Sequence, residues 1–258
     1  MRPVDLLPTS EPFPPSADLT GLRLLQLADS ALPIGSLTHS FGLESLVAKE
    51  ILTKKHLASF FRGYLEEAGM MDAVFCREGW RLGSVKEGEF SSSRWREINE
   101  LFSALKPARE TRSASSSLGD NFLCAVLACG DFPLLREALA ADGPDRKRPG
   151  QMGPKRKRMP IHHSPAFGLA CAVLRIDQDH ATLSYLHQSV ASLVSACQRL
   201  MPLGQREAMR LVWDLKPTII ETAERSRMRG IEDVSCSMPL LDWGSMEHPA
   251  LSTRLFIS

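Results

Sequence analysis

The chain has 258 residues and a mass of 28.5 kDa, which is enough for one sizeable core or at most two domains. Its 43% hydrophobic and 24% charged residues are typical of a soluble globular protein, and the net charge of +1 gives no overall field that favours nucleic acid or a membrane surface. The charge is uneven, because residues 145–158 carry +6 and the rest of the chain therefore carries −5.

Residues 1–20 are predicted to form a disordered N-terminal lead. The segment is rich in proline and contains few residues that could enter a core. It also lacks a continuous apolar stretch, so we do not expect a signal peptide. A short helix over residues 22–29 is expected to follow the lead.

Helical periodicity continues along most of the chain. Helices are predicted over residues 41–49, 53–80, 94–105, 108–128, 133–140, 165–174, 182–201 and 205–229, the last with a break at Pro217. No segment alternates apolar and polar residues over the length of a strand. The predicted fold is all-α, a single compact helical bundle of about eight to ten helices that occupies residues 21–235.

Residues 142–160 are expected to form a flexible basic insert, because prolines and glycines separate its two clusters of basic residues. A solvated linker is the favoured interpretation. A nucleic-acid or localisation patch and a docking element for an acidic partner remain open. Residues 236–258 are predicted to form a non-helical C-terminal tail that a partner binds, because Pro239, Gly244 and Pro249 interrupt its apolar residues.

The segment over residues 32–44 is more specialised than a plain connector. Pro33 fixes its own φ angle, and Gly35 and Gly42 permit backbone conformations or close contacts that a β-carbon would forbid. We call residues 32–44 the corner. A loop with this composition is either a structural turn or a contact surface.

The corner, residues 192–205 and residues 241–258 together resemble the urease accessory protein F (UreF) family. The corner reads Leu-Pro-Ile-Gly-Ser-Leu-Thr-His-Ser-Phe-Gly-Leu-Glu, the second block reads Ser-Leu-Val-Ser-Ala-Cys-Gln-Arg-Leu-Met-Pro-Leu-Gly-Gln, and the third contains Ser-Met-Glu-His and Arg-Leu-Phe-Ile-Ser. Ser192, Pro249 and Thr253 depart from the residues usual in the family. The similarity extends from about residue 22 to residue 258, apart from the basic insert.

The resemblance implies a non-catalytic adaptor or chaperone for urease maturation in the cytoplasm. Such a chain binds the accessory proteins D/H and the GTPase accessory protein G, docks on apo-urease and helps to deliver nickel. The resemblance also implies a homodimer, and the apolar stripe of Leu183, Leu186, Val190, Leu193 and Leu200 is a candidate surface for it. No cofactor is expected to bind this chain tightly, because nickel belongs to the whole assembly.

The candidate partner-binding residues come from the two ends of the chain. The resemblance and the composition of the segments select Pro33, Gly35, His39, Ser40, Gly42, Glu44, Arg254, Leu255 and Phe256. We hypothesise that the tail folds back onto the corner when the D/H partner binds, and that Arg254 then donates a hydrogen bond to a polar group of the corner.

Two alternatives come from other functional classes. A small helical metal-dependent enzyme would use His162, His163 and Asp179, provided that these side chains converge in a cleft. A helical nucleic-acid-binding module would use the basic insert, provided that the folded faces are basic as well. The sequence has neither a phosphate loop nor a nucleophile elbow, so neither nucleotide hydrolysis nor hydrolase chemistry is predicted. Asp177 is expected to cap the helix that follows it.

The six cysteines are scattered, and none forms a Cys-x-x-Cys pair. We expect them to be buried, reduced thiols, because a chain of this size has a core and does not need a disulfide framework.

Overall fold

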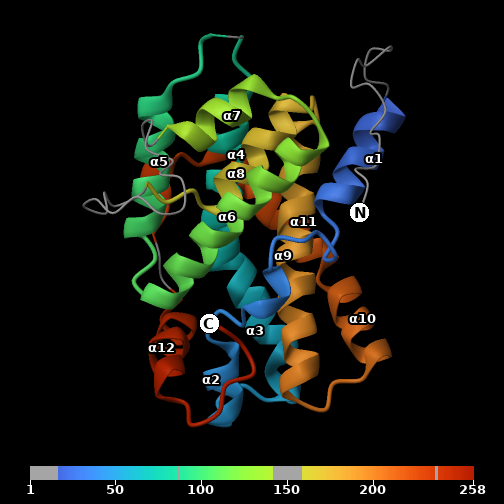
Figure 1. The fold of residues 1–258 in the computed structure, drawn as a ribbon. Helices are drawn as coiled ribbons and strands as arrows, with labels where there is room; N and C mark the ends of the chain where they lie inside the picture. Colours follow the sequence, from blue (N-terminus) through green and yellow to red (C-terminus); the bar gives the residue numbers. More distant parts are fainter. Residues whose placement is uncertain (1–16, 87, 142–158, 236–237) are drawn as a thin grey trace, which may run out of the picture.

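The computed structural model describes residues 17–86, 88–141, 159–235 and 238–258, and in these residues all regular structure is helical (Figure 1). The α-helices are α1 (Ala17–Leu27), α2 (Leu43–Ala48), α3 (Leu57–Tyr64), α4 (Met70–Gly83), α5 (Ser92–Ala104), α6 (Arg109–Cys129), α7 (Pro133–Ala140), α8 (His163–Val173), α9 (Gln178–Leu200), α10 (Gln205–Asp214), α11 (Lys216–Arg225) and α12 (Pro239–Glu247). Short 3₁₀ turns cover Ser36–Thr38, Lys54–His56, Ser226–Met228, Ile231–Asp233 and His248–Ala250.

The all-α prediction is confirmed. In two places, consecutive helices are almost continuous along the chain. A π-helical turn at Leu65–Gly69 joins α3 to α4, so the long helix predicted over residues 53–80 exists as one rod. Only Leu215 separates α10 from α11, which places the break just before Pro217. The cap predicted at Asp177 is also present, because its Oδ1 accepts from the amides of Asp179 and His180 at 3.0 Å.

Two boundary predictions are wrong. Helix α1 begins at Ala17, inside the predicted lead, and α12 lies inside the tail that was predicted to be non-helical. A helix forms in the tail because its prolines stand at places where they do not interrupt the helical hydrogen bonds. Pro239 stands at the first position of α12, where a missing amide costs nothing, and Pro249 stands two residues after the last residue of α12, Glu247. Residues 1–16 and most of the basic insert, 142–158, lie outside the described residues.

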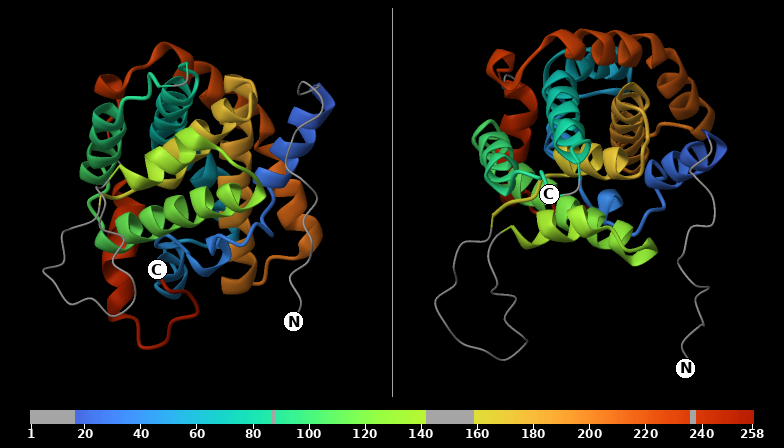
Figure 2. Two further views of the ribbon diagram at one scale, coloured as in Figure 1. Left: turned by 45° about the horizontal axis from the view of Figure 1, so that its top comes forward. Right: turned by 90° about the horizontal axis from the view of Figure 1, so that it is seen from above.

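The centre of the molecule is the crossing of α4 and α8 (Figure 2). A β-carbon on Gly168 would lie 1.8 Å from the carbonyl oxygen of Cys76, and one on Gly79 would lie 2.0 Å from that of Pro165. Glycine is therefore required at both positions, because the two backbones touch without intervening side chains.

Two apolar clusters surround this crossing. One packs the aromatic residues of α4, α5, α6 and α8, including Phe75, Trp95 and Phe167, and the other fills the space among α2, α3, α9 and α11. Phe41 of the corner packs against both clusters. The corner is therefore tied to the core on both sides of the molecule.

The apolar stripe of α9 belongs mainly to the second cluster. Leu186 and Val190 are fully buried and Leu193 is 5% exposed, while Leu183 and Leu200 are partly buried. This stripe is therefore used inside the chain, and the prediction that it offers a dimer surface is wrong. The described residues contain no helix long and apolar enough to cross a membrane.

The expectation for the cysteines holds in part. Cys76, Cys171 and Cys197 are buried free thiols, whereas Cys124 and Cys129 on α6 are exposed. Cys236 lies outside the described residues. Burial raises the pKa of Cys76 and of Cys197 to about 12, so neither thiol ionises near neutral pH.

The crossing of α4 and α8 gives a stability prediction. Gly168→Ala should lower the free energy of unfolding by about 3 kcal/mol or more, because the new methyl group would displace the α4 backbone. Gly63→Ala on α3 is the matched control. Nothing lies within 4 Å of the added methyl group there, so the gain in helix propensity should raise stability by about 1 kcal/mol. Guanidinium unfolding followed by circular dichroism measures both, and equal effects would contradict the prediction.

Candidate partner-docking site at the corner and the tail

The backbone of the corner is held in an uncommon conformation at its C-terminal end. Phe41 and Gly42 have φ angles of 51° and 91°, so two consecutive residues lie in the left-handed region. A β-carbon on Gly42 would lie 2.6 Å from the carbonyl oxygen of Leu241 and 2.7 Å from the amide nitrogen of Ser245. Gly42 therefore allows α12 to pack directly against the start of α2, as Figure 1 shows.

Glu44, in the first turn of α2, holds the tail. Its carboxylate accepts hydrogen bonds from the amide of Leu255 at 2.6 Å and from the amide of Phe256 at 3.1 Å. The residue is only 6% exposed. Hydrogen bonds to a buried carboxylate are charge-assisted, and the loss of one partner leaves a costly unsatisfied group.

His248 completes the buried carboxylate site. The residue is fully buried, its Nε2 lies 2.9 Å from Glu44 Oε2, and its Nδ1 lies 2.8 Å from Glu110 Oε2. Each ring nitrogen of His248 therefore lies within hydrogen-bonding distance of a different carboxylate. His248 therefore joins the end of α12 to α2 and to α6.

The last residues of the described tail run along the corner. The amide of Ile257 donates to the carbonyl oxygen of Thr38 at 2.9 Å, and the amide of Ser40 donates to the main-chain oxygen of Ser258 at 2.5 Å. His39 Nδ1 lies 2.7 Å from Ser258 Oγ. Partial burial lowers the pKa of His39, which favours the neutral imidazole.

Arg199, near the end of α9, brings the second sequence block into the same site. Its guanidinium carbon lies 3.9 Å from the centre of the Phe256 ring, and its Nη2 donates to the carbonyl oxygen of Leu37. The stacking is a cation–π contact. Arg199 therefore touches the corner and the tail at once, so all three blocks that carry the family resemblance meet at one place.

The predicted site residues divide into a buried and an exposed set. Ser40, Gly42, Glu44 and Phe256 are buried, and His39 is half-buried. The residues exposed to solvent are Pro33, Gly35, Arg254 and Leu255. The structure thus brings the corner and the tail together, with the buried members fastening the tail and the others forming the outer surface.

The hydrogen bond expected between Arg254 and the corner is absent. Arg254 has no hydrogen-bond or ion-pair partner among the residues that the structure describes, and its side chain is exposed. Glu44 and Arg199, rather than Arg254, make the polar contacts between the corner and the tail. The tail also lies on the corner within the single chain, so the fold-back that we attributed to D/H binding does not need a partner.

Three residues of the site were missed by the sequence reasoning: Arg199, His248 and Glu110. Arg199 and His248 lie inside the second and third blocks, so a charged or titratable residue within a block was a usable signal for both. Glu110 lies in no block, and only the packing of α6 against α12 shows its role.

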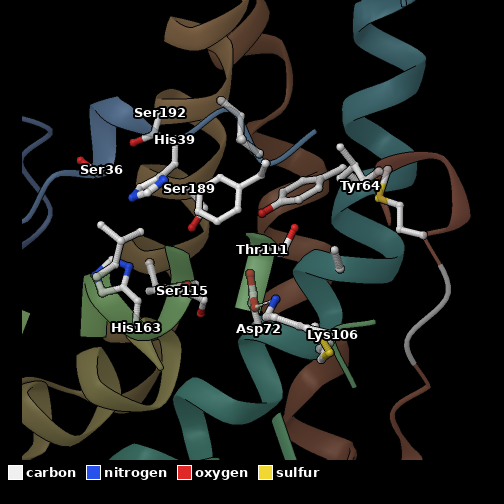
Figure 3. Close-up of a pocket in the computed structure, with 18 of the residues that line it drawn as sticks. Ser36, His39, Tyr64, Asp72, Lys106, Thr111, Ser115, His163, Ser189 and Ser192 are labelled. Atoms are coloured by element: carbon white, nitrogen blue, oxygen red, sulfur yellow. Dashed lines mark ion pairs between the residues drawn. The ribbon is translucent and has the colours of Figure 1, made fainter. Parts of the chain in front are cut away.

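A partly enclosed cavity of about 110 Å³ lies behind the corner and α12 (Figure 3). Each of the three blocks contributes to its wall. The lining residues are Ser36, His39, Phe41, Tyr64, Ala68, Met71, Asp72, Lys106, Thr111, Ser115, Leu118, His163, Tyr185, Gln188, Ser189, Ser192, Leu193, Met238, Leu241 and Asp242. Seven of these residues carry a hydroxyl group, while most of the surface of the wall is apolar.

The charges in the cavity wall lie near one another. Lys106 Nζ is 3.7 Å from Asp72 Oδ1. Burial raises the pKa of Asp72, and Lys106 partly offsets this effect. Burial also raises the pKa values of Tyr64 and Tyr185, so both phenols keep their protons and serve as neutral hydrogen-bonding groups.

His162, His163 and Asp179 do not form a common site. His162 Nε2 lies 2.7 Å from Ser103 Oγ, and its Nδ1 lies 3.0 Å from Ser115 Oγ. His163 packs among the rings of Phe122, Phe167 and Tyr185.

Asp179 pairs with Arg77 and Arg227 near the start of α9. Hydrogen bonds from Arg227 and Arg77 lower the pKa of its carboxyl group. Over the described part of the chain, no group of three or more His, Cys, Asp or Glu residues is arranged to hold a metal ion.

Comparison with known proteins gives a consistent result. A family model described as UreF matches residues 51–216. The urease accessory protein UreF of Picosynechococcus sp. is 30% identical over 239 residues, which cover 92% of this chain and 99% of that protein. The proteins of the same name from Rhodopseudomonas palustris and Corynebacterium glutamicum are each 29% identical, and they cover 92% and 91% of this chain and 92% and 96% of their own length.

His163 gives a pH-dependent prediction. Desolvation lowers its pKa to about 4, below the value of about 6.5 in an unfolded chain. Between these values the unfolded state binds the extra proton, so the free energy of unfolding falls as the pH falls. The contribution of His163 should be about 2 kcal/mol smaller at pH 5 than at pH 7.

His163→Phe should remove this part of the pH dependence, because the position is already surrounded by aromatic rings. The exposed His180, replaced by Gln, is the control. Guanidinium unfolding at both pH values provides the measurement. An unchanged difference between pH 7 and pH 5 in the His163 variant would show that the assignment is wrong.

Proposed function

The chain belongs to the UreF family of urease accessory proteins, and from this premise we propose that it is a non-catalytic adaptor of urease maturation. It binds the accessory proteins D/H and the GTPase accessory protein G. The assembly docks on apo-urease and delivers nickel to the metallocentre. The chain works in the cytoplasm, and it binds neither nickel nor any cofactor tightly by itself.

The convergence of the corner, the end of α9 and the tail is the observation that supports this proposal. Leu37 and Arg199 are 162 residues apart in the sequence, and Glu44 and Leu255 are 211 residues apart, yet each pair is in contact. Catalysis does not require such an arrangement of main-chain amides around one carboxylate. A docking surface benefits from it, because its outer side chains then keep fixed positions.

Exposed side chains beside the buried contacts give this surface its recognition chemistry. Leu255 is 60% exposed and Ile257 is 68% exposed, and Leu37 of the corner is 43% exposed. Arg254 lies among them with a guanidinium that is not paired within the described chain. An arginine beside apolar side chains suits a partner that presents a carboxylate at the edge of an apolar patch.

The alternative of a metal-dependent enzyme has little support from the geometry. His162 and Asp179 are each engaged by other side chains, and His163 packs among aromatic rings. The nucleic-acid alternative rests on residues 142–158, which lie outside the described residues. The chain without residues 145–158 carries −5, which does not favour a polyanion.

Recruitment of the GTPase partner tests the proposed surface. Arg254→Ala should weaken binding of the G protein to the complex with D/H by roughly tenfold to a hundredfold, as expected for a charge-assisted hydrogen bond of about 1.5–3 kcal/mol. His39→Ala should weaken it as well, because His39 fixes the end of the tail through Ser258. Arg136→Ala on α7, an exposed arginine outside both proposed binding surfaces, is the matched control.

The two losses should be less than additive in the double variant, because both act on the same stretch of tail. Binding is measured by surface plasmon resonance or co-purification with the purified partners. Strictly additive losses, or an equal loss in the Arg136 control, would show that the corner and the tail do not form one recruitment surface.

A homodimer is the second part of the proposal, and exposed apolar residues on α1 and α10 support it. Leu22 and Leu25 on α1 are 65% and 72% exposed, and Met209 and Trp213 on α10 are 70% and 66% exposed. Figures 1 and 2 show α1 and α10 on the same side of the molecule. A twofold axis between them would bring α1 of one copy to α10 of the other.

Charge introduced on this face should separate the copies. Trp213→Glu should change a dimeric light-scattering mass to a monomeric one at micromolar concentration, because a carboxylate would have to be desolvated in the interface. Leu240→Glu on α12 is the control, since that residue is exposed on another element. A monomeric wild-type chain, alone and with the D/H partner, would contradict the proposed dimer.

A further inference from the structure

A groove between α9 and α10 lies apart from the docking site at the corner. It has a volume of about 340 Å³, and it shares no lining residue with the cavity behind the corner. Ala191 and Val194 of α9 and Ala208 and Val212 of α10 belong to its apolar lining. A groove of this size between two helices is able to hold a short peptide segment.

Two large apolar side chains of this groove remain exposed to water. Met209 and Trp213 both line it, and they are 70% and 66% exposed. The two residues are four positions apart on α10 and therefore share one face of this helix. Exposed apolar side chains that adjoin a groove are typical of a surface that another segment covers.

A single cation lies at the groove. Among the described residues that line it, Lys216 is the only Lys, Arg, Asp or Glu, and its Nζ lies 3.7 Å from the centre of the Trp213 ring. No carboxylate of the described chain lies within ion-pair distance of Lys216. An occupant should therefore combine apolar side chains with a carboxylate that reaches this lysine.

The segment that precedes α1 has this composition. Residues 1–16, which lie outside the described residues, contain Leu6, Leu7 and the acidic Glu11, and five of the sixteen are proline. Proline fixes φ near the value of an extended chain, and grooves lined by aromatic side chains bind proline-rich peptides in that form.

The spacing of these residues matches the length of the groove. Gln205 and Trp213 both line it and are eight residues apart on α10, which corresponds to about 12 Å at a rise of about 1.5 Å per residue. An extended proline-rich chain covers about 12 Å in four residues, which is the separation of Leu7 from Glu11. With Glu11 at Lys216, beside Trp213, Leu7 therefore lies near Gln205.

The position of α1 allows the same chain to supply this occupant. Helix α1 begins at Ala17, and Figures 1 and 2 show it on the same side of the molecule as α10. Six residues lead from Glu11 to Ala17, and they span about 19 Å when extended. The segment is therefore tethered beside the face that it would cover, which raises its effective concentration there.

From these observations we propose that residues 1–16 dock in the α9–α10 groove of their own chain. Leu7 lies against the apolar lining, and the carboxylate of Glu11 pairs with Lys216. The docked segment covers Trp213, and in this respect the inference rests on the proposed dimer, whose face includes Trp213. The segment and a second copy of the chain then exclude each other, so release of the segment permits the dimer to form.

Disulfide trapping in the full chain tests the docking. The exposed cysteines and the one outside the described residues are first changed to Ser: Cys124, Cys129 and Cys236. In a glutathione redox buffer, Leu6→Cys should cross-link to Gln205→Cys at least tenfold faster than to Arg206→Cys. Arg206 is the matched control, because it is exposed and adjacent in sequence but does not line the groove.

Charge reversal tests the ion pair. Glu11→Lys or Lys216→Glu alone should slow the cross-link at least fivefold, because like charges then meet, and the two changes together should restore most of the rate. Mass spectrometry of an equal mixture of ordinary and ¹⁵N-labelled chains shows whether each cross-link lies within one chain. Cross-links between labelled and unlabelled chains would overturn the proposal, because the occupant would then be a second copy. Equal rates at the groove and control positions would overturn it as well.

Light scattering separates this inference from the proposed dimer. The cross-linked chain should dimerise at least tenfold more weakly than the same chain after reduction. Dimers of equal strength in both forms would overturn the proposed competition. A monomer in both forms would contradict the dimer itself, whereas the docking is decided by the cross-linking rates alone.

Discussion

Glu44 is a carboxylate with 6% of its surface exposed, and the position of the tail depends on how its charge is satisfied. A buried carboxylate is tolerated only with several hydrogen-bond donors around it. Here the donors are two main-chain amides of the tail and His248. Because these donors come from a segment more than 200 residues away, the charge of Glu44 specifies a long-range contact that apolar burial alone would leave undefined.

The helical frame makes this contact possible. The backbones of α4 and α8 touch at Gly79 and Gly168, which fixes the centre of the molecule at a short separation. The corner is tied to both apolar clusters through Phe41, and Gly42 lets α12 lie directly on the start of α2. A change of backbone spacing at the centre would therefore reach the corner through rigid packing rather than through a flexible loop.

The sequence predicted the helices well because their apolar periodicity and caps are local properties, as the cap at Asp177 shows. It did not predict α12, because Pro239 can begin a helix as well as interrupt one, and Gly244 can let a helix pack closely against another backbone as well as weaken it. It selected Glu44 and Phe256 through the family blocks, but assigned the tail's polar contact to Arg254. The choice between Arg254 and Arg199 is set by where α9 ends in space, and no spacing within the sequence reports that.

The C-terminal segment, residues 238–258, exposes more large apolar side chains than it buries. Its inner side carries Leu241 and Phe256 together with Ser245, His248 and the amides held by Glu44, whereas Trp243, Met246 and Leu255 are exposed. A segment that served only to close the core would bury these apolar side chains, because each would contribute about 1.5–3 kcal/mol. The exposed apolar side chains become buried only when another surface covers the segment. The energy of association then acts on a segment whose position is already set by Glu44 and His248, so a partner meets these side chains in fixed places.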